Sequence, residues 1–197
     1  MKKIISLALA FVLFAATQAQ AASETYSYDP LHTQILFSIN HMGFTQSFGR
    51  FNKFEGTFTL DEQKPEASSA TITIDTNSLD MADKTWDEHV SEKFLEPAKF
   101  PTIAFKSTKI TRTGDKTATM TGDLTLHGVT KPVTLDVMLN NVGMNPMMQT
   151  RKDAGFTIAG KIKRSDFGMS AFLPMVGDDV TLYIQVDGMH QVDKTNK

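Results

Sequence analysis

The side chains that could do chemistry in this chain are histidines, carboxylates and hydroxyls, because its 197 residues include no cysteine. That absence excludes disulfides, thiolate nucleophiles, and zinc or iron–sulfur sites built on cysteine. The five histidines are too widely spaced to form the metal-binding motifs H-E-x-x-H or H-x-H; they are His32, His41, His89, His127 and His190. We therefore predict no metal site and no cofactor.

Motifs for catalysis and for nucleotide binding are missing as well. The sequence holds no G-x-S-x-G, no G-x-G-x-x-G and no phosphate-binding loop. Ser38 and His41 fall on opposite faces of one expected strand, so they cannot form a nucleophile–base pair. A net charge of -2 argues against general binding to nucleic acid. We predict no catalytic residues, no enzymatic activity and no nucleic-acid partner.

His41 is the polar residue best placed to meet a ligand. It shares one strand face with Phe37 and Ile39 and lies just before Met42 and Gly43, where the strand is expected to end. Two interpretations stay open: a buried histidine that bonds to a backbone partner, or a polar contact at the mouth of a cavity. His89 lies on the helix face of apolar neighbours, which favours a role in the core.

From Ser27 onward the chain alternates apolar and polar residues with a period of two, which predicts strands. Eight segments carry this pattern, at residues 33–41, 54–60, 69–76, 102–107, 120–126, 133–139, 156–162 and 180–186. Eight antiparallel strands can close into a barrel and leave no free edge. We predict an all-β fold, an eight-stranded antiparallel barrel.

One segment, residues 81–95, breaks the alternation. Trp86, Val90 and Phe94 follow one another at spacings of four, which places them on one face of a helix. Asp83 can cap the start of this helix, and Pro97 follows its end. We expect a single amphipathic helix inserted between the third and fourth strands.

Residues 1–21 have the form of a secretory signal peptide. Lys2 and Lys3 precede an apolar run over residues 4–16 and the small-residue site Ala19-Gln20-Ala21. The run is too short to span a bilayer, which needs about 20 residues. We expect cleavage after Ala21, a single domain over residues 22–197, no transmembrane segment, and export to the periplasm.

A barrel of eight strands is either filled by its own side chains or holds one small ligand. Several phenylalanines fall on the inward faces next to Gly56, Gly122 and Gly160. Large rings beside missing side chains predict some internal space, but the pattern by itself leaves both a filled core and a ligand cavity open.

Five segments, in this order along the chain, carry a family resemblance. They are YDPLHTQILFSINHMGF, FGRFNKFEGTF, EHVSEKFLEPAKFPTIAFKSTKI, GDLTLHGVTKPVTLDV and RSDFGMSAFLPMVGDDVTLYI. Together they resemble the YceI-like family of lipocalin-like, polyisoprenoid-binding bacterial proteins, over the span from Tyr28 to Gly188. The chain has His32-Thr33 where that family usually has His-Ser, and His89-Val90 where it usually has His-Leu.

The resemblance implies a lipocalin-like barrel with an apolar channel for a long-chain amphiphilic lipid, such as an isoprenoid quinone, a polyprenyl phosphate or a fatty-acid derivative. It implies binding for transport, storage or stress response, without catalysis. We expect nine residues to line the channel: Phe37, Ile39, His41, Phe58, Ile72, Phe105, Leu124, Phe156 and Ile158.

Two alternatives and the oligomeric state stay open. The first alternative is an enzyme that acts on a lipophilic substrate through His41 and a nearby carboxylate. The second is a protein-interaction module with a filled core, which would use the Met144, Met147 and Met148 loop as an adaptable apolar surface. A homodimer is compatible with the sequence under either reading.

Overall fold

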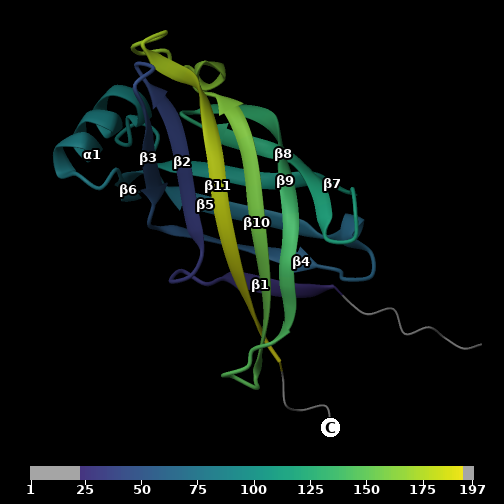
Figure 1. Cartoon of the computed structure of the whole chain (residues 1–197). Helices are drawn as coiled ribbons and strands as arrows, with labels where there is room; N and C mark the ends of the chain where they lie inside the picture. Colours follow the sequence, from purple (N-terminus) through teal and green to yellow (C-terminus); the bar gives the residue numbers. More distant parts are fainter. Residues whose placement is uncertain (1–22, 193–197) are drawn as a thin grey trace, which may run out of the picture.

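The computed structural model describes residues 23–192, which form one antiparallel sheet and a single short α-helix (Figure 1). The predicted signal peptide, residues 1–21, lies outside the described residues. The strands are β1 (Glu24–Tyr28), β2 (Gln34–His41), β3 (Thr45–Phe51), β4 (Phe54–Leu60), β5 (Ser69–Asp75), β6 (Leu79–Asp80), β7 (Thr102–Arg112), β8 (Thr117–Leu126), β9 (Val129–Met144), β10 (Arg151–Lys163) and β11 (Val176–Gln191). Within the described residues no helix is both long enough and apolar enough to cross a membrane.

Eight of the strands close into a ring, which confirms the predicted eight-stranded antiparallel barrel. The hydrogen-bonded order is β1, β4, β5, β7, β8, β9, β10 and β11, and β11 pairs back onto β1. The last strand is long enough to serve two neighbours: its C-terminal part pairs with β1 and its N-terminal part pairs with β2. β2 therefore continues the sheet past the closed ring, followed by β3 and β6.

Three strands were absent from the prediction: β1, β3 and β6. β1 is short, β6 has only two residues, and β3 reads TQSFGRF, in which the apolar alternation is weak. β1 pairs with β4 and β11, β3 pairs with β2, and β6 pairs with β3, and these pairings supply the hydrogen bonds of the three strands. Local alternation carries little information about strands whose stability comes from their neighbours.

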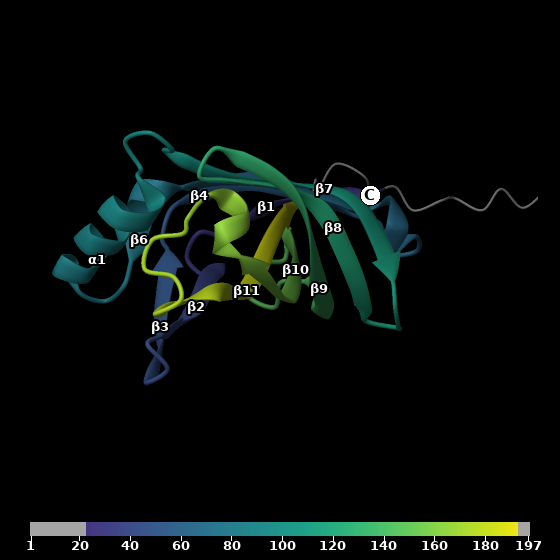
Figure 2. The ribbon, with the colours of Figure 1, turned by 90° about the horizontal axis from the view of Figure 1, so that it is seen from above.

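The inserted helix is present, but α1 spans Lys84–Val90 and continues as one wider π-helical turn over Ser91–Leu95. The Asp83 carboxylate accepts a hydrogen bond from the Trp86 backbone N–H at 3.0 Å, so the predicted cap is confirmed. The predicted start at Met81 was three residues too early, because the cap ends the extended segment before it. Viewed from above, the helix lies at one side of the barrel, next to β6 (Figure 2).

The glycines on the inward faces do not create the internal space that the sequence predicted. A Cβ atom at Gly122 would lie 2.4 Å from Cζ of Phe105, and one at Gly160 would lie 2.4 Å from Cδ2 of Leu135. At Gly56 a Cβ atom would lie 2.2 Å from the Thr71 carbonyl oxygen. These glycines therefore allow side chains or backbone to pack closely against them.

Candidate functional site: two joined cavities inside the barrel

Two cavities lie inside the barrel. The main cavity has a volume of about 470 Å³ and the second cavity about 220 Å³. Five residues belong to the walls of both cavities, so the two are neighbours along the barrel: Tyr28, Ala70, Met120, Ile158 and Val186. The main cavity alone falls within the size range of small-molecule binding sites.

The inward faces of the strands place all nine predicted lining residues in these walls. The main cavity takes Phe37, Ile39, His41, Ile72, Phe105, Leu124 and Ile158, and the second cavity takes Phe58, Phe156 and Ile158. Strand alternation places six of them on the inward faces of ring strands. The other three, Phe37, Ile39 and His41, lie on β2, which extends the sheet past the ring and lines the main cavity through its pairing with β11. Their contact with a ligand stays a prediction.

A chain of aromatic and imidazole rings closes one side of the main cavity. The His41 ring meets Trp86 edge-on at 5.9 Å, Trp86 stacks on His89 at 5.3 Å, and His89 lies 6.1 Å from Phe172, all measured between ring centroids. Phe94 lies 5.8 Å from Phe172 and completes the group. The helix face predicted as core therefore forms part of the cavity wall.

The sequence prediction missed many wall residues, and two of them, Phe172 and Met175, lie outside any predicted strand or helix. They lie in the connection between β10 and β11, where no strand or helix periodicity marks an inward face. Only the return of this connection over the end of β2 brings them to the cavity. A backbone hydrogen bond of 2.9 Å, from the Met42 N–H to the Met175 carbonyl, holds the connection against the end of β2.

The His41 imidazole has no hydrogen-bond partner among residues 23–192, whereas its backbone carbonyl accepts from the Phe44 N–H. One of its two interpretations required a backbone partner for the ring, and the described residues do not supply one. The ring is half-buried and lies in the wall of the main cavity. It is therefore placed to bond to a polar group inside the cavity.

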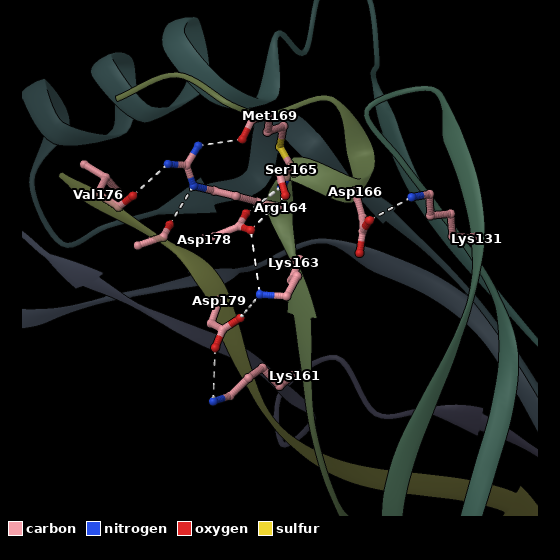
Figure 3. Close-up of polar contacts among 11 residues, drawn as sticks. Lys131, Lys161, Lys163, Arg164, Ser165, Asp166, Met169, Val176, Asp178 and Asp179 are labelled. Carbon is pink, nitrogen blue, oxygen red and sulfur yellow. Dashed lines mark hydrogen bonds and ion pairs between the residues drawn. The ribbon is translucent and has the colours of Figure 1, made fainter. Parts of the chain in front are cut away.

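Arg164 is a buried cation in the same wall, with only 2% of its surface exposed. Its guanidinium donates to three backbone carbonyls, those of Met169, Val176 and Gly177, at 2.5, 2.9 and 2.7 Å (Figure 3). The guanidinium also lies 5.2 Å from the centre of the Phe94 ring. Burial lowers its pKa. Arg164 thus ties the end of β10 to the connection that follows.

The second cavity opens toward a different set of side chains. Its wall includes Glu62, Arg112, Asp115 and Lys116. Nearby, the Lys152 ammonium donates to the carboxylates of Glu24 and Glu62, each at 2.6 Å. This end of the barrel therefore carries several charged groups, most of them in ion pairs.

With the fold and the cavities described, the chain can be compared with known proteins. The pattern of the YceI-like domain matches residues 26–187. The chain belongs to the YceI-like family. A relative called Protein YceI, from Salmonella arizonae, is 40% identical over 191 residues, which cover 96% of this chain and 98% of the relative.

Solved structures of YceI-like proteins share the fold. Burkholderia cenocepacia BcnA has a TM-score of 0.73 at 25% identity, covering 81% of this chain and 98% of BcnA. A polyisoprenoid binding domain from Saccharophagus degradans, implicated in plant cell wall breakdown, has a TM-score of 0.61 at 14% identity. That match covers 86% of this chain and 99% of the domain, and at this identity it shows the fold alone.

The fold of this YceI-like chain also assembles a polar cluster that its sequence did not reveal. Side-chain ligand atoms of Asp29, His32 and Asp187 all lie within 4.8 Å of one another. Asp29 already accepts hydrogen bonds from the His32 ring, at 2.8 Å, and from the Leu31 N–H, also at 2.8 Å. The Asp29–His32 pair is visible in the sequence as a spacing of three, but Asp187 joins it only through the pairing of β11 with β1.

Proposed function

We propose that this protein binds a long-chain amphiphilic lipid inside the barrel and releases it unchanged. The lipid is an isoprenoid quinone, a polyprenyl phosphate or a fatty-acid derivative, and the binding serves transport, storage or stress response. The single observation that carries this proposal is the pair of neighbouring cavities, whose walls are mostly aliphatic and aromatic side chains.

The energetics favour a long apolar tail in this space. Each methylene group moved from water into an apolar wall contributes about 0.8 kcal/mol. Association costs several kcal/mol, and a flexible chain adds to that cost. A cavity that is already formed reduces the cost of ordering, so a ligand that reaches from the main cavity into the second gains the most.

The polar part of the lipid is expected at the main cavity, near His41. The imidazole there lacks a protein hydrogen-bond partner within the described chain, and Arg164 places a positive charge in the same wall. Nothing pairs His41 with a hydrogen-bonded carboxylate among residues 23–192, so no observation favours the alternative of an enzyme. A domain described as polyisoprenoid-binding shares this fold, and that shared fold is compatible with a binding role.

The proposed location is the periplasm, after export and removal of residues 1–21. A protein that shields a long prenyl or acyl chain is useful in an aqueous compartment between membranes, because such a chain cannot cross water unprotected. The predicted signal sequence supports this location.

The test fills the junction between the two cavities. Ala70 lies in both walls, so Ala70→Trp should fill the passage without burying a charge. The wild type and Ala70→Trp are purified gently, and circular dichroism confirms that each is folded. Native and denaturing mass spectrometry then measure the lipid that each retains. The wild type should release a lipid of unchanged mass, and Ala70→Trp should retain less lipid or only shorter chains.

The matched control is Thr71→Trp, because Thr71 is the next residue on β5 and its side chain is exposed. It should retain lipid like the wild type. Equal lipid in folded Ala70→Trp would contradict binding in the cavities. A product of altered mass would contradict release of the lipid unchanged.

A further inference from the structure

Exposed apolar side chains gather where the main cavity opens. Five of the twelve exposed large apolar residues lie on two segments, residues 40–48 and 168–177, which we call the rim. These five are Met42, Phe44, Phe48, Phe172 and Met175. Phe44 is the most exposed of them, at 87%, and lies at the tip of the hairpin between β2 and β3. A concentration of this kind on a folded protein marks an interaction surface.

The rim is continuous with the interior. Met42, Phe172 and Met175 are exposed to solvent and also belong to the wall of the main cavity. The two segments lie together at the top of Figure 1, joined by the hydrogen bond from Met42 N–H to the Met175 carbonyl. An apolar molecule can therefore pass from the outer surface of the rim into the cavity along apolar contacts.

The rim carries no formal charge. Its first segment reads NHMGFTQSF and its second reads GMSAFLPMVG, with no lysine, arginine, aspartate or glutamate in either. Elsewhere charged residues are frequent, at 21% of the chain. Charged side chains are costly to move out of water, so their absence suits a surface that enters an apolar environment.

Backbone polar groups of the rim bond within the rim. The Phe44 N–H donates to the His41 carbonyl at 3.0 Å, and the Gly43 N–H donates to the Asn40 side-chain oxygen at 2.8 Å. The Val176 N–H donates to the Phe172 carbonyl at 2.9 Å, and Arg164 satisfies three further carbonyls from beneath (Figure 3). Backbone groups must be satisfied internally wherever water is displaced by lipid.

Two exposed residues of the rim have left-handed backbone conformations. Met42 and Phe172 have φ values of 55° and 59°, in the left-handed region that non-glycine residues rarely occupy. In both cases the side chain that this geometry presents is apolar and exposed. At Met42 this conformation belongs to the hairpin turn that the bond from the Phe44 N–H to the His41 carbonyl closes.

We propose that the rim docks onto the surface of a zwitterionic lipid bilayer, so that lipid passes directly between the membrane and the main cavity. This inference rests on the proposed function and adds the partner that supplies or receives the ligand. A bilayer fits better than a charged partner because the rim offers apolar contact and no charge. The other exposed apolar loop, Met144 to Met148, lies at the opposite end of the barrel, where Arg151, Lys152 and Asp153 begin β10 (Figure 1).

The test is flotation with phosphatidylcholine vesicles, using the chain that begins at residue 22. This chain contains every element of the described fold and lacks the apolar run of residues 4–16, which could itself bind lipid. The wild type should float with the vesicles equally at about 0.15 M and at about 1 M sodium chloride, because apolar contact is not screened by salt. Phe44→Ser should reduce the partitioning of the protein onto vesicles about tenfold or more, since the variant has no phenylalanine ring at this position to bury in the bilayer.

Two variants serve as controls for the Phe44 effect. Leu31→Ser removes a similarly exposed apolar side chain, 84% exposed, at the opposite end of β2 and should leave partitioning unchanged. Phe44→Trp should restore it, because tryptophan is favoured at membrane interfaces. Phe44 lies outside both cavity walls, so Phe44→Ser loaded with lipid from detergent should retain as much lipid as the wild type.

Docking and lipid binding can be separated by measuring both in each variant. Ala70→Trp, with its filled passage, should still float with vesicles even though its lipid content falls. Equal flotation of Phe44→Ser and wild type would overturn the docking proposal while leaving the cavity proposal intact. The docking proposal would also be overturned if the wild type did not float and formed a dimer that Phe44→Ser dissociates. Size-exclusion chromatography would show this dimer, and the rim would then be assigned to contact with a second copy of the chain.

Discussion

The end of the barrel around the second cavity and the end that carries the rim differ in how their side chains pack. At the first, Tyr26 is fully buried and stacks on Phe58 at 5.0 Å, and Phe156 meets Phe58 edge-on at 5.6 Å. Ion pairs of Lys152 with Glu24 and Glu62 surround this aromatic group. At the rim, Phe172 and Met175 remain exposed, and the buried cation Arg164 bonds only to backbone carbonyls.

Stability and ligand exchange are therefore expected to depend on opposite ends of the barrel. Dense aromatic packing holds β1, β4 and β10 together where the ring closes, so that end resists opening. The rim contributes little buried area of its own and has its apolar groups available to a partner. Lipid exchange is therefore expected at the rim, while the packed end sets the global stability.

The largest expected effect tests that division directly. Phe58→Ala should lower the free energy of unfolding by about 3–5 kcal/mol, because it removes a buried ring from the stack with Tyr26. Phe172→Ala, in the rim, should cost about 1 kcal/mol or less, since its ring is partly exposed. Urea denaturation of both variants gives the two values. Similar costs would show that the ends do not differ in the way proposed.

An intermediate loss of stability is expected on replacing Arg164. This prediction compares a buried cation with the ion pairs that Lys152 forms nearer the surface. Arg164→Met should cost about 3 kcal/mol, because three carbonyls lose a charged donor. Lys152→Met should cost about 1 kcal/mol or less, because its carboxylate partners stay within reach of water. Denaturation curves in the same buffer measure both, and a larger loss for Lys152→Met would reverse the ranking.

The smallest effect concerns pH and the cluster beside β1. The hydrogen bond to Asp29 raises the pKa of His32 above its ordinary value of 6.5. Burial alone would raise the pKa of Asp29, but hydrogen bonds from His32 and the Leu31 N–H outweigh it and hold that pKa low. The stabilisation from protonated His32 is therefore complete below pH 6.5 and is lost as the pH rises through the raised pKa.

The variant His32→Gln isolates this contribution. The melting temperature of the wild type should exceed that of His32→Gln at about pH 5.5, and the difference should shrink by about pH 8.5. Burial and the neighbouring carboxylates Asp153 and Asp29 raise the pKa of Asp187, and the charge on His32 lowers it, so the measured difference reports His32 together with its effect on Asp187. A difference that is constant over this range would show that the pair contributes no pH-dependent stability.

Alternation along the strands was enough to predict much of this molecule. It indicated an eight-stranded barrel, and it placed the nine predicted residues on faces that the structure turns inward. The helix cap at Asp83 was equally local, because its carboxylate bonds to an N–H only three residues away. Each of these features depends on neighbours in sequence, and residue types at short spacing therefore determine it.

What only the tertiary structure decided depends on residues far apart in the chain. β1 and β3 form because they pair with strands already in place, and the glycines that seemed to leave space instead admit close packing of Phe105 and Leu135. The rim exists because the connection before β11 folds over the tip of β2, which joins Met42 to Met175. Short-range periodicity cannot encode these contacts, since each of them joins residues that are far apart in the chain.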